Sequence, residues 1–270
     1  MPEQPEAARD GLAPTRPPAA IEAIRFPSSE ELSQDQEWCE VRLRGARPRR
    51  IRFHDYHLVY GVPGLYERLF YDTLRCDSPA RVVGLLADVL NDSDDAPGDL
   101  RALDVGAGNG MVGEELHAIG IPEVTGVDII AEAKEAAERD RPDVYEEYYV
   151  TDLTDLPEGV ERHLRSRDFN LLSSVAALGF GDLPADAFLK ALDLLETPGW
   201  LAFNIKEDFL HEEDRSGFAR LVRQLSRSRI IQIQAYRRYQ HRLSATGKPL
   251  YYVAMIARKL RDVPDELMTA

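Results

Sequence analysis

The strongest chemical signal in the chain is the segment Leu-Asp-Val-Gly-Ala-Gly-Asn-Gly at residues 103–110. A short apolar run ends there in glycines and leads into a segment with helical spacing. Glycine lets a backbone turn tightly and approach a ligand without a Cβ clash. The helix N-terminus beyond the turn presents unpaired amide N–H groups to polar ligand atoms. A turn of this kind suits several nucleotide-derived cofactors and does not choose among them by itself.

Two further acids narrow the choice. Asp128 closes the next apolar run along the chain, and Asp152 closes the run after it. A carboxylate at the end of the second strand is suited to accept hydrogen bonds from a ribose diol. At the end of the third strand, a carboxylate can accept from an exocyclic amine such as that of adenine. With Asp104 they would line one crevice, which favours a ligand with an adenine, a ribose and a cationic sulfonium over a pyrophosphate.

The segments that must position these residues alternate between strand-like and helix-like runs. The predicted strands are 102–106, 124–128, 145–152, 169–175 and 199–205, and the predicted helices are 111–119, 131–139, 185–195 and 217–226. Such alternation predicts an α/β fold, a Rossmann-like doubly wound and mostly parallel sheet. Two long strand-like runs, 230–243 and 249–260, follow with only a glycine-containing turn between them, which predicts a C-terminal antiparallel hairpin and seven strands in all.

The N-terminal part has a different character. Residues 1–20 are rich in proline and charge and are expected to be a disordered tail. Residues 21–98 are expected to form an extension with a β-hairpin at 37–53, an aromatic and partly helical stretch at 55–76, and a helix from 78 to 90. Ser78 is its expected N-cap, with Pro79 in the first turn. The cofactor-binding domain would then span 99–262, and 263–270 would be a tail.

Composition excludes several classes of protein. The chain has 270 residues, 44% hydrophobic and 30% charged, with a net charge of −14 at pH 7. No apolar run is long enough for a membrane span, and the N-terminus lacks the apolar core of a secretory signal. The negative charge disfavours binding to long nucleic acid. Cys39 and Cys76 fit neither a zinc site nor a redox pair. We therefore expect a soluble, cytoplasmic protein without a metal.

The ordered series LDVGAGNG, GVD, TDLTDLP, FNLLSSVAALGFG and PGWLAFNIKE resembles the motifs of class I S-adenosylmethionine-dependent methyltransferases, over about residues 99–260. The resemblance implies S-adenosyl-L-methionine as cofactor and in-line methyl transfer to a small-molecule acceptor as activity. It implies that the glycines and Asp104 surround the methionine portion and ribose, that Asp128 holds the ribose hydroxyls, and that Ser174 lies near the sulfonium. The implied cofactor set is Asp104, Gly106, Gly108, Asn109, Gly110, Asp128, Ile129, Asp152, Leu153 and Ser174.

Two alternatives stay open. Residues 108–113 satisfy G-x-G-x-x-G with Asp128 downstream, so an NAD(P)-dependent oxidoreductase of the Rossmann type is one of them. The earlier glycine Gly106, the third acid Asp152 and the terminal hairpin weigh against it. The other alternative is a non-catalytic protein that binds S-adenosylmethionine. Within the methyltransferases, no Asn-Pro-Pro-Tyr or Pro-Cys motif follows the fourth strand, and residues 175–182 contain one acid, which leaves small-molecule O-, N- or C-methylation.

The sequence indicates the acceptor side only weakly. Tyr60 and Tyr71, in the aromatic stretch before the domain, are expected to line the substrate pocket. His54, His57 and His211 are candidate bases, and none of them stands out. A sulfonium donor is already activated, so a methyltransferase can work by positioning alone. A run of arginines consists of Arg42, Arg44, Arg47, Arg49, Arg50 and Arg52. We interpret this arginine run as the solvated face of a hairpin, and contact with an anionic substrate or RNA is the alternative.

Overall fold

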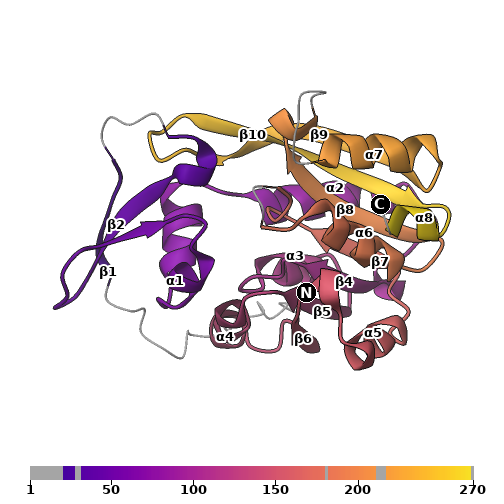
Figure 1. The fold of residues 1–270 in the computed structure, drawn as a ribbon, viewed down its shortest axis with the longest axis horizontal. Helices are drawn as coiled ribbons and strands as arrows, with labels where there is room; N and C mark the ends of the chain where they lie inside the picture. Colours follow the sequence, from indigo (N-terminus) through magenta and orange to yellow (C-terminus); the bar gives the residue numbers. More distant parts are fainter. Residues whose placement is uncertain (1–20, 28–31, 180–181, 211–216, 269–270) are drawn as a thin grey trace, which may run out of the picture.

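The computed structural model describes residues 21–27, 32–179, 182–210 and 217–268. Within them the chain forms a three-stranded sheet and a seven-stranded sheet with helices on both of its faces (Figure 1). The predicted tail at 1–20 and the candidate base His211 lie outside these ranges. No helix in the described part of the chain is long and apolar enough to cross a membrane.

The seven-stranded sheet has the order β6-β5-β4-β7-β8-β10-β9. Its strands are β4 (Arg101–Val105), β5 (Glu123–Asp128), β6 (Glu147–Val150), β7 (Leu171–Ser174), β8 (Gly199–Lys206), β9 (Ile231–Leu243) and β10 (Pro249–Lys259). The first five in spatial order pair in parallel, whereas β10 runs antiparallel to both β8 and β9. The predicted fold, a doubly wound sheet that ends in an antiparallel hairpin, is confirmed.

Apolar side chains on both faces explain why the central strands are buried between helix layers. The helices are α2 (Ser78–Asn91), α3 (Met111–Ala118), α4 (Ala131–Asp140), α5 (Glu158–Arg165), α6 (Ala185–Asp193), α7 (Phe218–Arg227) and α8 (Asp265–Met268), with short 3₁₀ turns η3 (Pro97–Asp99), η4 (Leu153–Asp155) and η5 (Glu207–Leu210). One hydrophobic cluster joins α2 and α3 to the sheet, and another joins α5, α6 and α7 to the opposite face. Because the strands β6, β5, β4, β7 and β8 run parallel, their carboxyl ends lie at one common edge of the sheet.

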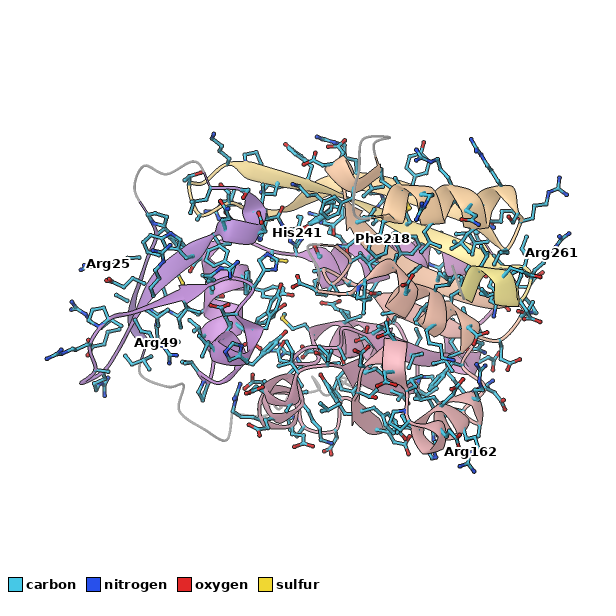
Figure 2. The ribbon with its side chains drawn as sticks, viewed as in Figure 1. Arg25, Arg49, Arg162, Phe218, His241 and Arg261 are labelled. Atoms are coloured by element: carbon cyan, nitrogen blue, oxygen red, sulfur yellow. The ribbon has the colours of Figure 1, made fainter. Side chains whose placement is uncertain are left out.

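Residues 21–27 and 32–76, which we call the N-terminal unit, have a hydrophobic cluster of their own. The elements are β1 (Ile21–Arg25), η1 (Gln34–Gln36), β2 (Trp38–Leu43), β3 (Arg49–Arg52), α1 (Tyr56–Tyr60) and the π-helix η2 (Glu67–Thr73). The predicted hairpin is β2–β3, and β1, which the sequence pattern did not reveal, pairs with β2. All six arginines of the run are exposed, and Arg25 and Arg49 project from the far end of the molecule in Figure 2.

The two longest strands connect this unit to the sheet. In Figure 1 the β9–β10 hairpin extends past the sheet and reaches the N-terminal unit. There the Leu243 amide donates to the Leu74 carbonyl at 2.7 Å. The buried Arg242 guanidinium pairs with the buried Glu37 carboxylate at 2.6 Å. The hairpin tip therefore fixes the N-terminal unit over the edge of the sheet.

One local prediction is wrong, and two short elements were not predicted. The helix α2 begins at Ser78 with Asp77 as N-cap, so Ser78 is not the capping residue. The Ser78 hydroxyl instead bonds the Tyr239 hydroxyl at 2.7 Å and His241 Nδ1 at 2.6 Å, because the start of α2 packs on β9. The helix α5 was not predicted, since its sequence is mostly charged. The segment expected as a C-terminal tail includes the short helix α8.

Candidate active site

A cavity of about 310 Å³ lies at the carboxyl ends of β4, β5, β6 and β7. The N-terminal unit forms its far wall through His54, Tyr56, Tyr60 and Tyr66. In open α/β sheets this edge, where the strand order reverses, is the usual place for a ligand. We call it the cofactor cavity.

Asp128 lines the cavity where β5 ends. Its Oδ2 accepts from the Gly108 amide at 2.9 Å, and its Oδ1 accepts from the Ile130 amide at 3.0 Å. Burial raises the pKa of this carboxyl, and the backbone hydrogen bonds oppose that shift. Each carboxylate oxygen can accept more than one hydrogen bond, so both retain capacity for ligand hydroxyls.

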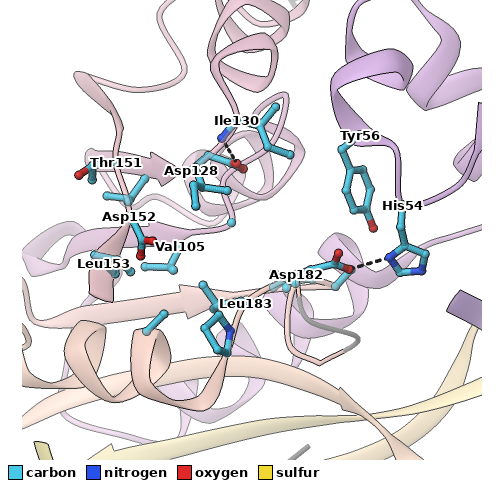
Figure 3. A pocket seen from close by; sticks show the side chains of 18 of the residues that line it. His54, Tyr56, Val105, Asp128, Ile130, Thr151, Asp152, Leu153, Asp182 and Leu183 are labelled. Carbon is cyan, nitrogen blue, oxygen red and sulfur yellow. Dashed lines mark hydrogen bonds and ion pairs between the residues drawn. The ribbon is translucent and has the colours of Figure 1, made fainter. Parts of the chain in front are cut away.

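Ile129, the next residue, is 59% exposed and lines the same cavity. Beside it Asp152 and Leu153 form the rim (Figure 3). Asp152 Oδ1 accepts from the Thr154 amide and hydroxyl, and these bonds lower the pKa of the carboxyl. A carboxylate next to an exposed apolar side chain provides what an adenine needs: an acceptor for its amine and a surface for its ring.

The glycine turn forms the floor of the cavity through Gly106, at φ +73°. A Cβ at this position would lie 2.5 Å from the Ala177 Cβ, so only glycine fits. Gly108 and Asn109 lie behind this surface. A Cβ on Gly108 would meet the Tyr60 hydroxyl at 2.5 Å, and the Asn109 amide donates to Glu67 at 3.2 Å. The close approach of Tyr60 to Gly108 and the hydrogen bond from Asn109 to Glu67 hold the turn against the N-terminal unit.

Asp104 lies beneath the turn and is 1% exposed. Its Oδ1 accepts from the Ser173 hydroxyl at 2.7 Å, and its Oδ2 accepts from the Tyr145 hydroxyl at 2.8 Å. Burial raises the pKa of this carboxyl to about 6, although both hydrogen bonds act against the shift. Since Tyr145 also donates to the Ala107 carbonyl, Asp104 supports the turn from below.

The raised pKa of Asp104 makes stability depend on pH. The folded state keeps this proton to higher pH than an unfolded Asp with a pKa near 3.9, so the stabilisation is present at low pH and is lost as pH rises toward 6. We expect the free energy of unfolding to fall by about 1 kcal/mol more in the wild type than in Asp104→Asn between pH 5 and pH 7. Urea denaturation at the two pH values measures this difference, and parallel pH dependence would contradict it.

The opposite end of the cavity holds His54, Tyr56 and Asp182 (Figure 3). His54 Nδ1 lies 2.8 Å from Asp182 Oδ2. A carboxylate only accepts hydrogen bonds, so Nδ1 carries the hydrogen and the neutral ring has its lone pair on Nε2. The same arrangement, a carboxylate that orients an imidazole, occurs in general-base catalysis.

Ala176 forms the wall between the two ends and has φ +59°, a left-handed conformation that is strained for alanine. Its amide donates to the Asn204 Oδ1 at 2.7 Å. Asn204 in turn donates to the Tyr239 hydroxyl at 2.6 Å, within the hydrogen-bond chain that contains Ser78. The buried Ser174, two residues before Ala176, has a hydroxyl without a hydrogen-bond partner.

The predicted site residues divide into two groups. Those that line the cavity are Gly106, Asp128, Ile129, Asp152, Leu153 and Tyr60. Those behind its surface are Asp104, Gly108, Asn109, Gly110, Ser174 and Tyr71. Gly110 is the N-cap of α3 at φ +89°, and Tyr71 packs against Tyr66. The sequence did not assign Asp182, Tyr56 or Ala176 to the site, because none of them lies in a recognisable motif. It also did not distinguish His54 from His57 as the candidate base.

The charges around the cavity favour a cationic ligand. The described residues that line it include Asp128, Asp152 and Asp182 and no lysine or arginine. A pyrophosphate would have no cation to pair with there, whereas a sulfonium would lie in a cavity lined by carboxylates. No group of three or more His, Cys, Asp or Glu in the described ranges is arranged to hold a metal ion.

Comparisons with known proteins found one family model and several solved structures of similar fold. Residues 103–203 match the family model described as a methyltransferase domain. The chain has 15% identity and a TM-score of 0.52 with the N-methyltransferase NodS from Bradyrhizobium japonicum in complex with S-adenosylhomocysteine, with 77% of this chain and 98% of that one covered. For the magnesium protoporphyrin IX methyltransferase from Synechocystis with bound S-adenosylmethionine the identity is 16%, the TM-score 0.47 and the coverage 67% and 79%. The comparison with curated proteins gave no match.

The matched domain and the fold indicate a class of protein. Residues 103–203 match a methyltransferase domain, and this match together with the seven-stranded sheet supports the class I S-adenosylmethionine-dependent methyltransferase superfamily. S-adenosylmethionine is the cofactor that this match supports. The likeness to the solved structures concerns the fold, and the acceptor must be argued from the site.

Proposed function

We propose that the protein transfers the methyl group of S-adenosylmethionine to a small-molecule acceptor at the His54 end of the cofactor cavity. The observation that carries this proposal is one cavity with two chemically different ends. Acceptors suited to adenosine, Asp128 and Asp152, lie at one end, and the imidazole–carboxylate pair His54–Asp182 lies at the other.

The cofactor supplies a methyl group already activated by the sulfonium charge. The chain's own residues bind and orient it: Asp128 accepts from the ribose hydroxyls, Ile129 packs on the adenine, and Asp152 with Leu153 reads the adenine edge. Gly106 lets the methionine portion lie against the backbone. We assign the residues behind the surface, Asp104, Gly108, Asn109, Gly110 and Ser174, a supporting part in holding the glycine turn and the end of β7.

At the other end His54 Nε2 takes the proton of the acceptor, while Asp182 holds the ring and stabilises its charged form. Tyr56, Tyr60 and Tyr66 stack in series, with ring centroids 6.1 Å and 4.8 Å apart, and close the cavity toward the N-terminal unit. They exclude water from the reacting atoms. In this proposal the N-terminal unit acts as a substrate cap on the domain, and α2, which packs on the large sheet, belongs to the domain.

The lining of the cavity supports a small acceptor over a nucleic acid. Its described lining contains no lysine or arginine for a phosphate backbone. The six exposed arginines of the run do not line the cavity, and Arg49 lies at the far end of the N-terminal unit (Figure 2).

Ligand-induced stabilisation tests the cofactor assignment against the dinucleotide alternative. S-adenosylhomocysteine at 100 times its Kd should stabilise the fold by about 2.7 kcal/mol. For a chain of this size that raises the Tm by roughly 5–10 °C. NAD at the same concentration should leave the Tm unchanged, and the reverse pattern would refute the proposal. A product screen with labelled methyl donor then separates an enzyme from a non-catalytic binder.

A further inference from the structure

A second cavity of about 40 Å³ adjoins the cofactor cavity on the side of the N-terminal unit, and we call it the inner chamber. Both cavities share the lining residues His54, Tyr56, Tyr66, Ala176 and Asp182. A water needs about 10–15 Å³ of such volume. The chamber therefore has room for the polar end of a ligand whose body lies in the larger cavity, and not for a whole substrate.

The deep wall of the chamber holds an amide with an unmet hydrogen bond. Gln34 is 8% exposed and lines the chamber. Its Nε2 donates to the Tyr252 hydroxyl at 2.7 Å, while its Oε1 is buried without a partner. Because a hydroxyl can accept and donate at once, Tyr252 keeps its own proton for another acceptor. A buried polar atom left unpaired destabilises the fold, and a suitable ligand group would recover that loss.

Among the described residues that line the chamber, the basic side chains Arg242 and His54 already pair with carboxylates, so neither is available to an anionic group. Arg242 lines it but pairs with Glu37 at 2.6 Å, and both side chains are almost fully buried. His241 lines it too, and burial with the neighbouring Arg242 lowers the pKa of this imidazole well below its ordinary value, so the ring is neutral. A carboxylate or phosphate would lose its hydration without gaining a cation to pair with.

The shape of the surroundings suits a flat molecule. Five phenylalanine and tyrosine rings line the chamber, those of Phe53, Tyr56, Tyr66, Phe70 and Tyr252. Aromatic walls favour a planar ring packed face or edge against them. The shared residue His54 lies where the ring would pass from one cavity into the other.

We propose that the methyl acceptor is a small aromatic compound with two hydroxyl groups, one held in the inner chamber by Gln34 and Tyr252 and the other methylated beside His54. The held hydroxyl donates to Gln34 Oε1 and accepts from the Tyr252 hydroxyl, a pair of roles that an ammonium or a carboxylate does not combine. This inference rests on the proposed function. It makes Gln34 a specificity-determining residue.

Phenol, catechol, resorcinol and hydroquinone are the probes that test it, because they differ in the presence and spacing of the second hydroxyl. Calorimetry on the full chain saturated with S-adenosylhomocysteine should show at least one dihydroxy probe bound about tenfold more tightly than phenol. Gln34→Met should abolish this advantage and leave phenol binding within about twofold. Gln36→Met is the matched control, since Gln36 is exposed on the same 3₁₀ turn, and should retain the advantage.

Equal binding of phenol and all dihydroxy probes, no binding of any probe, or an advantage that survives Gln34→Met would each overturn the inference. So would a crystal structure with the bound probe's hydroxyls away from Gln34 and an ordered water in the chamber. Failure of the proposed function is distinguishable from failure of this inference. In that case S-adenosylhomocysteine itself would not bind in the first step of the same titration. A Tm of Gln34→Met close to that of the wild type shows that the variant is folded.

Discussion

Replacing Asp128 with Asn lowers the affinity for S-adenosylhomocysteine about 100-fold, since hydrogen bonds to a charged group contribute about 1.5–3 kcal/mol each. The carboxylate accepts from the Gly108 and Ile130 amides with its two oxygens. An Asn amide has one oxygen, so its NH₂ would face one of these N–H donors and only half of the acceptor capacity for the ribose would remain. Isothermal titration calorimetry measures the change directly.

The neighbouring acids supply graded controls for this result. Asp152→Asn should weaken binding by roughly threefold to tenfold, because the exposed carboxylate would lose one hydrogen bond that solvent partly replaces. Asp155→Asn, exposed and on the adjacent turn η4, should change nothing. Unchanged affinity of a folded Asp128→Asn variant would show that the ribose does not lie at the end of β5.

Replacing His54 with Asn lowers turnover by roughly 100- to 10,000-fold, which is the usual contribution of a general base. The Asn amide nitrogen can take the place of Nδ1 and keep a hydrogen bond to Asp182, so the substitution removes Nε2 with little disturbance of the wall. The affinity for S-adenosylhomocysteine should stay within about twofold, since Asp128 and Asp152 lie at the other end of the cavity. Turnover is measured with labelled donor and the acceptor that the product screen identifies.

His57→Asn is the matched control for this substitution. His57 lies on α1 and is exposed, and it does not line the cofactor cavity. Its replacement should leave turnover unchanged. Asp182→Asn should reduce turnover by roughly tenfold or more, because the ring loses the carboxylate that orients it. If His54→Asn and His57→Asn were equally active, the acceptor would be deprotonated without His54.

The large sheet could be predicted from the sequence because the apolar pattern of each strand shows which of its faces are buried. The run around Leu103 is apolar on both faces, as a buried parallel strand must be, and the glycines after it identify the turn. Asp128 and Asp152 could be placed in one cavity because parallel strands end at a common edge. The position of Ile129 followed from Asp128, and its 59% exposure beside the cavity is what an adenine-packing residue requires.

The acceptor end could not be predicted in the same way. His54 and Asp182 are 128 positions apart and come from connecting segments, so no local pattern announces their contact. Asp104 looked like a ligand-binding acid, but whether an acid at a strand end points into a cavity or beneath it depends on its partners, here Ser173 and Tyr145. Gln34 had no signal at all, since its partner Tyr252 is 218 residues away.

The β9–β10 hairpin that secures the N-terminal unit also sets the timing of folding during synthesis. Glu37 leaves the ribosome 205 residues before its partner Arg242. At roughly 5–20 residues per second, the first part of the chain waits roughly 10–40 seconds for the segment that fixes it. The cofactor cavity therefore gains its aromatic wall only after the β9–β10 hairpin has been synthesised, and until then the apolar side chains of β2, β3 and α1 depend on chaperones or on their own cluster for protection.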